Sequence, residues 1–184
     1  MRFDNRDDIL QLTPQWTGER FPNGRPRVPD DVLKRLEKVA LEEAWGVCWG
    51  HDYKYQFQGD WKVINGSRTL VGRAVTGVMV PRRPDLHDTL LEYGHKEEGR
   101  VGFFNSWVIE TLVQDDVLVI DMFDKIFQGT YSGGNLSTAI ATRTGRGQVI
   151  YGGIRDAQQV MEIPNLLTFC KGVDPTAIGD VTMV

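Results

Sequence analysis

The strongest constraint on the fold is a strand–helix–strand pattern within residues 116–156, with two pairs of glycines beside the regular elements. Residues 117–121 (VLVID) form a continuous apolar run bounded by charge, which is typical of a strand buried on both faces. Residues 135–144 (NLSTAIATRT) predict a helix with Asn135 as its N-cap. Residues 148–151 predict a second strand. This alternation favours an α/β fold with a largely parallel central sheet.

The rest of the chain is expected to form an arm and one domain. Residues 1–29 predict an extended N-terminal arm, because four prolines interrupt any helix or central strand there. Residues 30–184 predict a single α/β domain of catalytic type. It opens with a helix to about residue 48, whose apolar residues recur at spacings of three and four. Residues 49–67 predict a loop with one strand at most. Further strands are expected over 70–80 and 166–170, and further helices over 84–94, 106–112 and 156–161.

Composition excludes several classes of function. Of 184 residues, 21 are Lys or Arg and 25 are Asp or Glu, so the net charge of −4 removes the electrostatic attraction that drives non-specific nucleic-acid binding. No apolar run approaches the roughly 18 residues of a membrane span, and the first ten residues lack the apolar core of a secretory signal. Two cysteines are too few for a disulfide framework. A cytoplasmic protein without nucleic-acid or membrane partners is therefore expected.

The two glycine pairs lie where ligands are usually bound in such folds. The first pair, 133–134, stands directly before the predicted helix, where bare backbone N–H groups bind a carboxylate or phosphate. The second pair, 152–153, follows the next strand and precedes Arg155 and Asp156. Ligands in open α/β sheets bind at the carboxyl ends of the strands. The pattern thus predicts an anion cradle facing an Arg–Asp pair; the alternative is two ordinary turns and a surface ion pair.

The stretch from 116 to 156 resembles the regulator of ribonuclease activity A-like family, which includes the 4-hydroxy-4-methyl-2-oxoglutarate aldolases. The family pattern is a Gly-rich turn followed, about twenty residues later, by an Arg–Asp pair close to a Gly-Gly. Weaker similarity in GRAVTGV (72–78) and LEEAW (41–45) extends the resemblance over about 33–184, so the arm lies outside it.

The resemblance implies an α/β/β-type sandwich that assembles as a homotrimer or a dimer of trimers, with active sites between subunits. It also implies a divalent metal, Mg²⁺ or another ion such as Mn²⁺, and pyruvate as product. On this chain Asp156 would hold the metal, and Arg155 would be catalytic by pairing with the carbonyl oxygen of a 2-oxo acid. The turn 133–136 (Gly133, Gly134, Asn135 and Leu136) would bind the substrate, with the amides of Asn135 and Leu136 on its carboxylate.

The chain departs from the family pattern in three places. Aldolase members usually carry an acid twenty-one positions before the arginine, where this chain has Gly134. Glu43 is the candidate catalytic substitute, with Asp121 and Asp124 as alternatives. A glycine usual three residues after the aspartate is replaced by Gln159, and the chain ends in DVTMV, where family members continue with further strands.

Two functions follow as expectations. The first is a metal-dependent lyase that cleaves a 4-hydroxy-2-oxo acid, decarboxylates oxaloacetate, or does both through a pyruvate enolate. The second is a non-catalytic regulatory protein that binds an RNA-degrading enzyme. The Arg155–Asp156 pair favours the enzyme, and the missing acid at Gly134 favours the regulator.

Overall fold

The computed structural model describes residues 5–66, 68–179 and 181–184. The chain forms two compact units, residues 1–56 and 57–184, which are described separately. None of the helices among these described residues is long and apolar enough to cross a membrane.

The first unit is helical. Its elements are α1 (Arg6–Leu12), α2 (Asp30–Leu36) and α3 (Leu41–Gly50). Helix α1 lies within the segment predicted as an extended arm; Asn5 caps it by accepting a hydrogen bond from the amide of Asp8 at 2.9 Å. The single helix predicted to residue 48 is wrong. The chain leaves the helical conformation before Ala40, whose ψ of 152° is extended, and α3 starts anew after it.

The second unit contains the central sheet, and its order confirms the predicted α/β class. The strands are β1 (Lys62–Ile64), β2 (Arg73–Val78), β4 (Asp116–Asp121), β5 (Gly147–Ile154) and β6 (Leu167–Val173). They lie in the order β1-β6-β5-β4-β2. Strands β2, β4, β5 and β6 are mutually parallel, and only β1 is antiparallel within this sheet. Two short strands, β3 (Val80–Pro81) and β7 (Val181–Met183), pair with each other separately.

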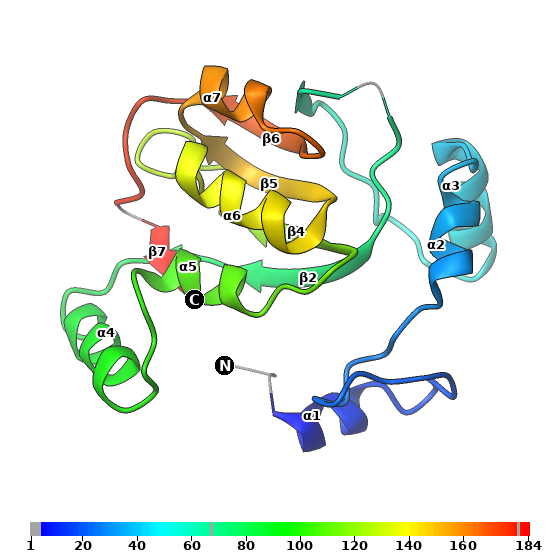
Figure 1. Cartoon of the computed structure of the whole chain (residues 1–184), viewed down its shortest axis with the longest axis horizontal. Coiled ribbons are helices and arrows are strands. Elements are labelled where there is room, and N and C mark those ends of the chain that lie inside the picture. Colours follow the sequence, from blue (N-terminus) through cyan, green and yellow to red (C-terminus); the bar gives the residue numbers. More distant parts are fainter. Residues whose placement is uncertain (1–4, 67, 180) are drawn as a thin grey trace. The chain divides into compact units, whose positions relative to one another are not determined.

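Helices cover one face of this sheet. They are α5 (Phe104–Glu110), α6 (Gly134–Thr144) and α7 (Ala157–Glu162), whereas α4 (His87–Lys96) lies to the side and packs against α5, where the His95 and Trp107 rings meet edge to face. Figure 1 shows α6 and α7 lying over the same face, in front of β4, β5 and β6. The core fills this layer: Leu118 and Ile150 of the sheet, Ile140 of α6 and Val160 of α7 are all fully buried. Burial of each such side chain stabilises the unit by about 1.5–3 kcal/mol before entropic costs.

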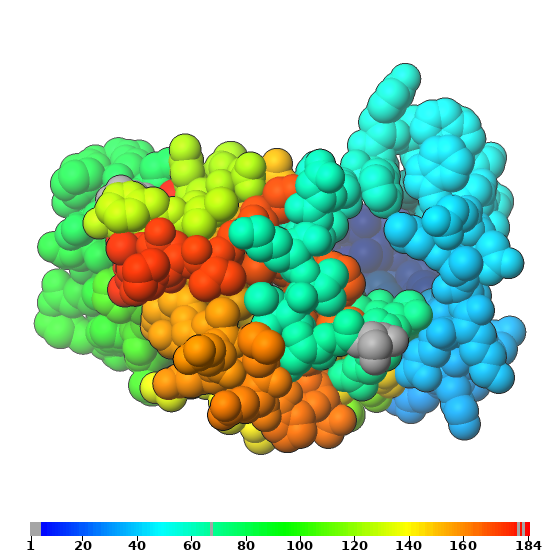
Figure 2. All heavy atoms as spheres, turned by 90° about the horizontal axis from the view of Figure 1, so that it is seen from above, coloured from blue at the N-terminus to red at the C-terminus, as the bar shows by residue number. Residues whose placement is uncertain are grey.

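The opposite face of the sheet is largely open. Val63, Phe169, Val149 and Val119 lie in register across four strands, and Val63 is 48% exposed. Strand β4 is only partly buried on this second face: Val117 is buried, but Val119 and Asp121 are partly exposed, because no helix among the described residues of 57–184 packs against them. The segment before β1 lies against β6, as Figure 2 shows. There the amino group of Lys171 donates to the carbonyls of residues 59 and 60.

Candidate functional site

The turn before α6 and the end of β5 lie side by side because their main chains are hydrogen-bonded. The Tyr131 amide donates to the Gly153 carbonyl at 2.9 Å, and the Arg155 amide donates to the Ser132 carbonyl at 3.0 Å. A parallel bridge joins Thr130 to Gly153. The structure thus brings the two glycine turns together, as the sequence predicts, and places them at the carboxyl ends of parallel strands.

Asp156 reaches from the second turn to the start of α6. Its backbone is left-handed, with φ 55° and ψ 41°, and its side chain does not cap the helix that follows it. Instead, Oδ2 accepts a hydrogen bond from the Gly134 amide at 3.1 Å. Negative charge is stabilised at that position by the helix dipole. Within the described chain, Oδ1 has no hydrogen-bond partner, and the side chain is 41% exposed.

Gly133 permits this close approach. A Cβ built on Gly133 would lie 2.2 Å from Asp156 Oδ2 and 2.9 Å from both Cγ and Nε of Arg155. Its backbone is extended, at φ −118° and ψ −162°. The position requires glycine for space rather than for conformation.

Arg155 carries a hydrogen-bond donor with no partner. Its Nε lies 3.7 Å from Asp156 Oδ2, and the side chain is 28% exposed. Its Nη1 is buried and makes no hydrogen bond to any described residue. Leaving a buried donor unsatisfied costs about 1–3 kcal/mol. An anionic ligand would supply the missing acceptor, because a guanidinium binds carboxylates in a fixed, forked geometry.

The helix that forms the predicted anion cradle begins one residue earlier than expected. Asn135 is not the N-cap, because α6 already begins at Gly134 and Gly133 precedes it as the cap residue. Glycine has no side chain to cap with, and the carboxylate of Asp156 takes that role from another segment. Asn135 is exposed and Leu136 half-buried. Their amides stand in the first turn, where the helix provides no acceptor.

A buried polar network underlies the turn, and the sequence reasoning missed it. The amide of Gln148 accepts from Ser132 Oγ at 2.9 Å and donates to Ser137 Oγ and Thr168 Oγ1, each at 3.1 Å. All four residues are fully buried. The available signal was Gln148 itself, a polar residue beside the apolar run of β5. The network fixes Ser132, whose carbonyl holds the Arg155 amide.

The substitute carboxylates have other partners. Glu43 belongs to the first unit, where its carboxylate accepts from the Ala40 amide at 2.9 Å and so caps α3. Asp121 accepts from the Phe123 amide at 2.7 Å. Asp124 is exposed and has a φ of 57°. Among the described residues of the second unit, no hydrogen bond or ion pair joins Asp121 or Asp124 to Asp156.

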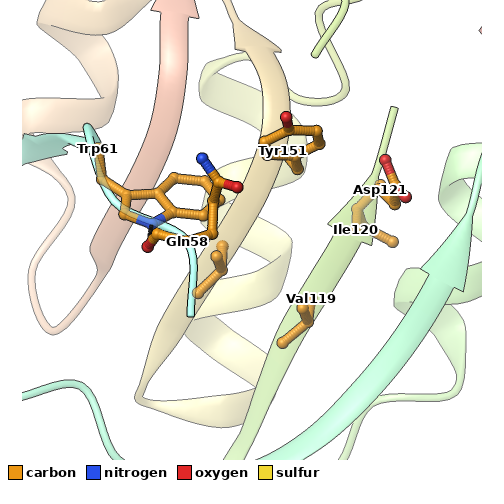
Figure 3. Close-up of a pocket in the computed structure, with 7 residues that line it drawn as sticks. Gln58, Trp61, Val119, Ile120, Asp121 and Tyr151 are labelled. Atoms are coloured by element: carbon orange, nitrogen blue, oxygen red, sulfur yellow. Dashed lines mark hydrogen bonds between the residues drawn. The ribbon is translucent and has the colours of Figure 1, made fainter. Parts of the chain in front are cut away.

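A separate groove of about 270 Å³ lies on the open face of the sheet. It is lined by Gln58, Trp61, Val119, Ile120, Asp121, Val149 and Tyr151. Figure 3 shows Trp61 and Gln58 beside Tyr151, with Asp121 on the neighbouring strand. The Trp61 and Tyr151 rings meet edge to face at 5.9 Å. Of the residues predicted for the site, only Asp121, one of the alternative acids, lines this groove, and neither Arg155 nor Asp156 does.

Asp156 meets the minimum requirement for a magnesium site. Across residues 5–66, 68–179 and 181–184, no three His, Cys, Asp or Glu side chains gather in a way that could hold a metal ion. Mg²⁺, however, is commonly bound through one or two carboxylates, with water and substrate oxygens completing an octahedron. Asp156 is half exposed and its Oδ1 makes no hydrogen bond, so it could act as the single carboxylate ligand of such an ion. A site that needs several protein ligands would not fit these residues.

Comparison with known proteins agrees with this fold. A crystal structure of Streptomyces coelicolor RraAS2, described as an unusual member of the RNase ES inhibitor RraA protein family, has a TM-score of 0.64 at 22% identity, covering 82% of this chain and 68% of that one. A structure described under novel cellulases from gut-associated microbes has a TM-score of 0.66 at 18% identity, covering 96% and 70%. An uncharacterized Pseudomonas syringae protein has a TM-score of 0.55 at 18% identity, covering 82% and 62%.

At these identities the solved structures show the fold alone. No curated protein matches the chain. The family model described as RraA-like (Aldolase/RraA) matches residues 47–182, which is well over half of the sequence. That match includes both glycine turns and the Arg155–Asp156 pair, and the chain therefore belongs to the RraA-like family.

Proposed function

We propose that this chain is a divalent-metal-dependent lyase that acts on 2-oxo acids at the Gly133–Asp156 site. The observation that carries the proposal is the buried, unpartnered Nη1 of Arg155, next to a helix start that no local side chain caps. An oxo acid offers acceptors for both sets of donors.

The chain's residues would divide the substrate between them. The amides of Asn135 and Leu136 would bind the carboxylate at the α6 start, where the helix dipole favours negative charge. Arg155 would donate to the 2-oxo oxygen, on which negative charge develops during the reaction. Asp156 would hold Mg²⁺ or Mn²⁺, and the bound ion would supply Lewis-acid polarisation of the carbonyl.

Two reactions lead to the same product at such a site. Retro-aldol cleavage breaks the C3–C4 bond of a 4-hydroxy-2-oxo acid, and decarboxylation breaks the corresponding bond of oxaloacetate. In both, the electron pair of the broken bond forms the C2–C3 double bond of a pyruvate enolate. Arg155 would stabilise the enolate oxygen, and protonation of C3 by water would then release pyruvate.

An oligomer, proposed as a homotrimer or dimer of trimers, accords with the exposed sheet face. An apolar row across several strands is seldom left to solvent in a monomer. Val63, at the β1 end of that row, and Val78, on β2 opposite Asp121, are each about half exposed.

A second function is supported by one specific observation. Gly134 leaves the turn without the acid that the aldolases carry, so the chain could instead act as a regulator that binds an RNA-degrading enzyme. Such a protein would use a surface and would need neither Arg155 nor a metal.

The test is oxalate binding, because oxalate resembles the enolate of pyruvate in shape and charge. We expect calorimetry to show magnesium-dependent binding by the full chain, and oxaloacetate to release pyruvate faster than with magnesium alone. Asp156→Ala should abolish both. Glu110→Ala, which removes an exposed acid at the end of α5, is the matched control and should change neither. Binding that survives Asp156→Ala would refute the metal role, and absence of any binding by the unaltered chain would favour the regulator.

A further inference from the structure

The two edges of the central sheet differ in how they are protected. Strand β1, at one edge, has three residues and includes the exposed Lys62. Strand β2, at the other edge, has six residues, and its stretch 74–78 (AVTGV) contains no charged residue and no proline. Short length, charge and proline are features that keep an edge strand from pairing with another chain. The β1 edge has two of these features, and the 74–78 stretch of β2 has none.

The outer side of β2 presents main-chain groups that have no partner in the second unit. Toward β4, the Arg73 amide donates to the Asp115 carbonyl at 2.9 Å and the Met79 amide to the Asp121 carbonyl at 2.8 Å. Because the direction of these groups alternates along a strand, residues 74, 76 and 78 point their N–H and C=O groups away from β4. No described residue of 57–184 makes a main-chain hydrogen bond to these three.

The side chains beside this row leave the edge uncharged. Ala74, Thr76 and Val78 are exposed on the open face of the sheet, and Val78 is 51% exposed. Gly77 faces the helical layer, since a Cβ built on it would lie 3.0 Å from Ile120 Cδ1. Figure 1 shows β2 as the last strand on its side of the sheet. The described part of the second unit thus ends in a row of three donors and three acceptors.

We propose that β2 pairs with β2 of a second copy of this chain, antiparallel and centred on Thr76, so that the central sheet continues from one protomer into the next. In this register Thr76 faces the partner subunit's Thr76, and Ala74 faces the partner subunit's Val78. Facing residues of this kind exchange both main-chain hydrogen bonds, so all the outward groups of 74, 76 and 78 are satisfied. A shift by one residue would place outward groups opposite inward ones.

The second copy is the occupant because this edge is complementary to itself. A twofold axis at Thr76 lets the same row serve as donors and acceptors on both chains, as an interface between identical surfaces requires. No like charges meet, although each chain has a net charge of −4. A cross-strand pair of threonines is also favourable. The pairing is independent of the reaction proposed at Asp156.

Thr76→Lys and Thr76→Glu test the register, because position 76 faces itself. Each variant alone brings like charges together, which destabilises a cross-strand pair. Light scattering of the full chain over a dilution series should therefore show half as many chains per particle as for the unaltered protein. An equimolar mixture of the two variants should restore the original number, since lysine then faces glutamate. Thr142→Lys is the matched control: it adds the same charge at an exposed position of α6 and should leave the number unchanged.

Thr76→Pro tests the main-chain hydrogen bonds themselves. Proline removes the outward N–H, which β4 does not use, and it is tolerated on edge strands at such positions. This variant should also halve the number of chains per particle while circular dichroism shows a folded protein. Thr76→Val, which keeps the amide and the shape of the side chain, should not.

Three results would overturn the inference. The first is an unaltered chain that is monomeric or has an odd number of copies, which would leave the edge to a different protein or to none. The second is a folded Thr76→Pro variant with an unchanged number of chains per particle. The third is a mixture of the Lys and Glu variants that fails to regain the original number.

Discussion

Gly133→Ala should separate the function of the site from the stability of the fold. The added Cβ would start 2.2 Å from Asp156 Oδ2. To reach ordinary contact the carboxylate must retreat by about 1 Å, which takes it out of hydrogen-bond range of the Gly134 amide. The same methyl meets Cγ and Nε of Arg155 at 2.9 Å, so the guanidinium must move as well.

The two effects on stability are small and of opposite sign. Losing the bond from Gly134 to the half-exposed Asp156 costs about 1 kcal/mol, toward the low end for a charged acceptor because water replaces the donor. Replacing glycine by alanine in an extended conformation returns about 0.4–1 kcal/mol by restricting the unfolded chain. The free energy of unfolding should therefore change by less than about 1 kcal/mol.

Ligand binding should respond much more strongly, because both Asp156 and Arg155 are displaced. We expect the Kd for oxalate with magnesium to rise at least tenfold, about 1.4 kcal/mol. Calorimetric titration and thermal unfolding on the same sample would measure both quantities. Gly46→Ala is the control: its Cβ meets nothing within 4 Å, so it should leave the Kd unchanged. A folded Gly133→Ala chain with unaltered oxalate affinity would refute the reasoning.

Three further predictions concern the scaffold. Gln148→Ala should lower the free energy of unfolding by about 2–4 kcal/mol in urea titrations, since it removes three buried hydrogen bonds and leaves a cavity; a loss below about 1 kcal/mol would contradict the role given to the network. Gly147→Ala places a Cβ 2.0 Å from the Leu167 carbonyl oxygen and should cost more than about 3 kcal/mol, which an unchanged Tm would disprove. Hydrogen bonds from the Thr176 hydroxyl and amide hold the pKa of Asp174 below its usual value. The contribution of ionised Asp174 to the free energy of unfolding is therefore present above about pH 4, the ordinary range for the pKa of Asp. It is lost as the pH falls through the lowered pKa. Asp174→Asn should thus lose stability at pH 6 but little at pH 2–3, and a pH-independent difference would argue against this linkage.

The sequence was most informative where a pattern is local and long. The apolar run of β4, the following helix and the glycine-flanked β5 predicted the α/β class, because each depends on residues within one element. The same logic failed near residue 40. The periodic apolar residues continue through the break, but Glu43 reaches back to the Ala40 amide and starts a new helix there.

The sequence predicted that the two glycine turns lie together, but it did not predict the contacts between them. Two glycine pairs and an adjacent Arg–Asp pair indicated where a ligand would bind. That Gly133 makes room for Asp156, and that Gln159 covers Gly134, depends on the left-handed backbone at Asp156 and on the packing of α7. The spacing of residues along the sequence does not indicate either contact, because many residue types can stand before a short helix without adopting a left-handed backbone. The sequence also did not predict that the second face of β4 is partly exposed, since an apolar run does not reveal whether a second layer covers the strand.

The juxtaposition of the two turns depends on peptide groups, through the hydrogen bonds of Tyr131 and Arg155 and the bridge at Thr130. Every amino acid except proline supplies such groups. Loop side chains upstream of Ser132, such as the exposed Phe123 and Phe127, could therefore be exchanged without displacing the Arg155–Asp156 pair. Replacing the side chains of that loop could therefore change which molecules reach the site while the main-chain hydrogen bonds keep the two turns in place.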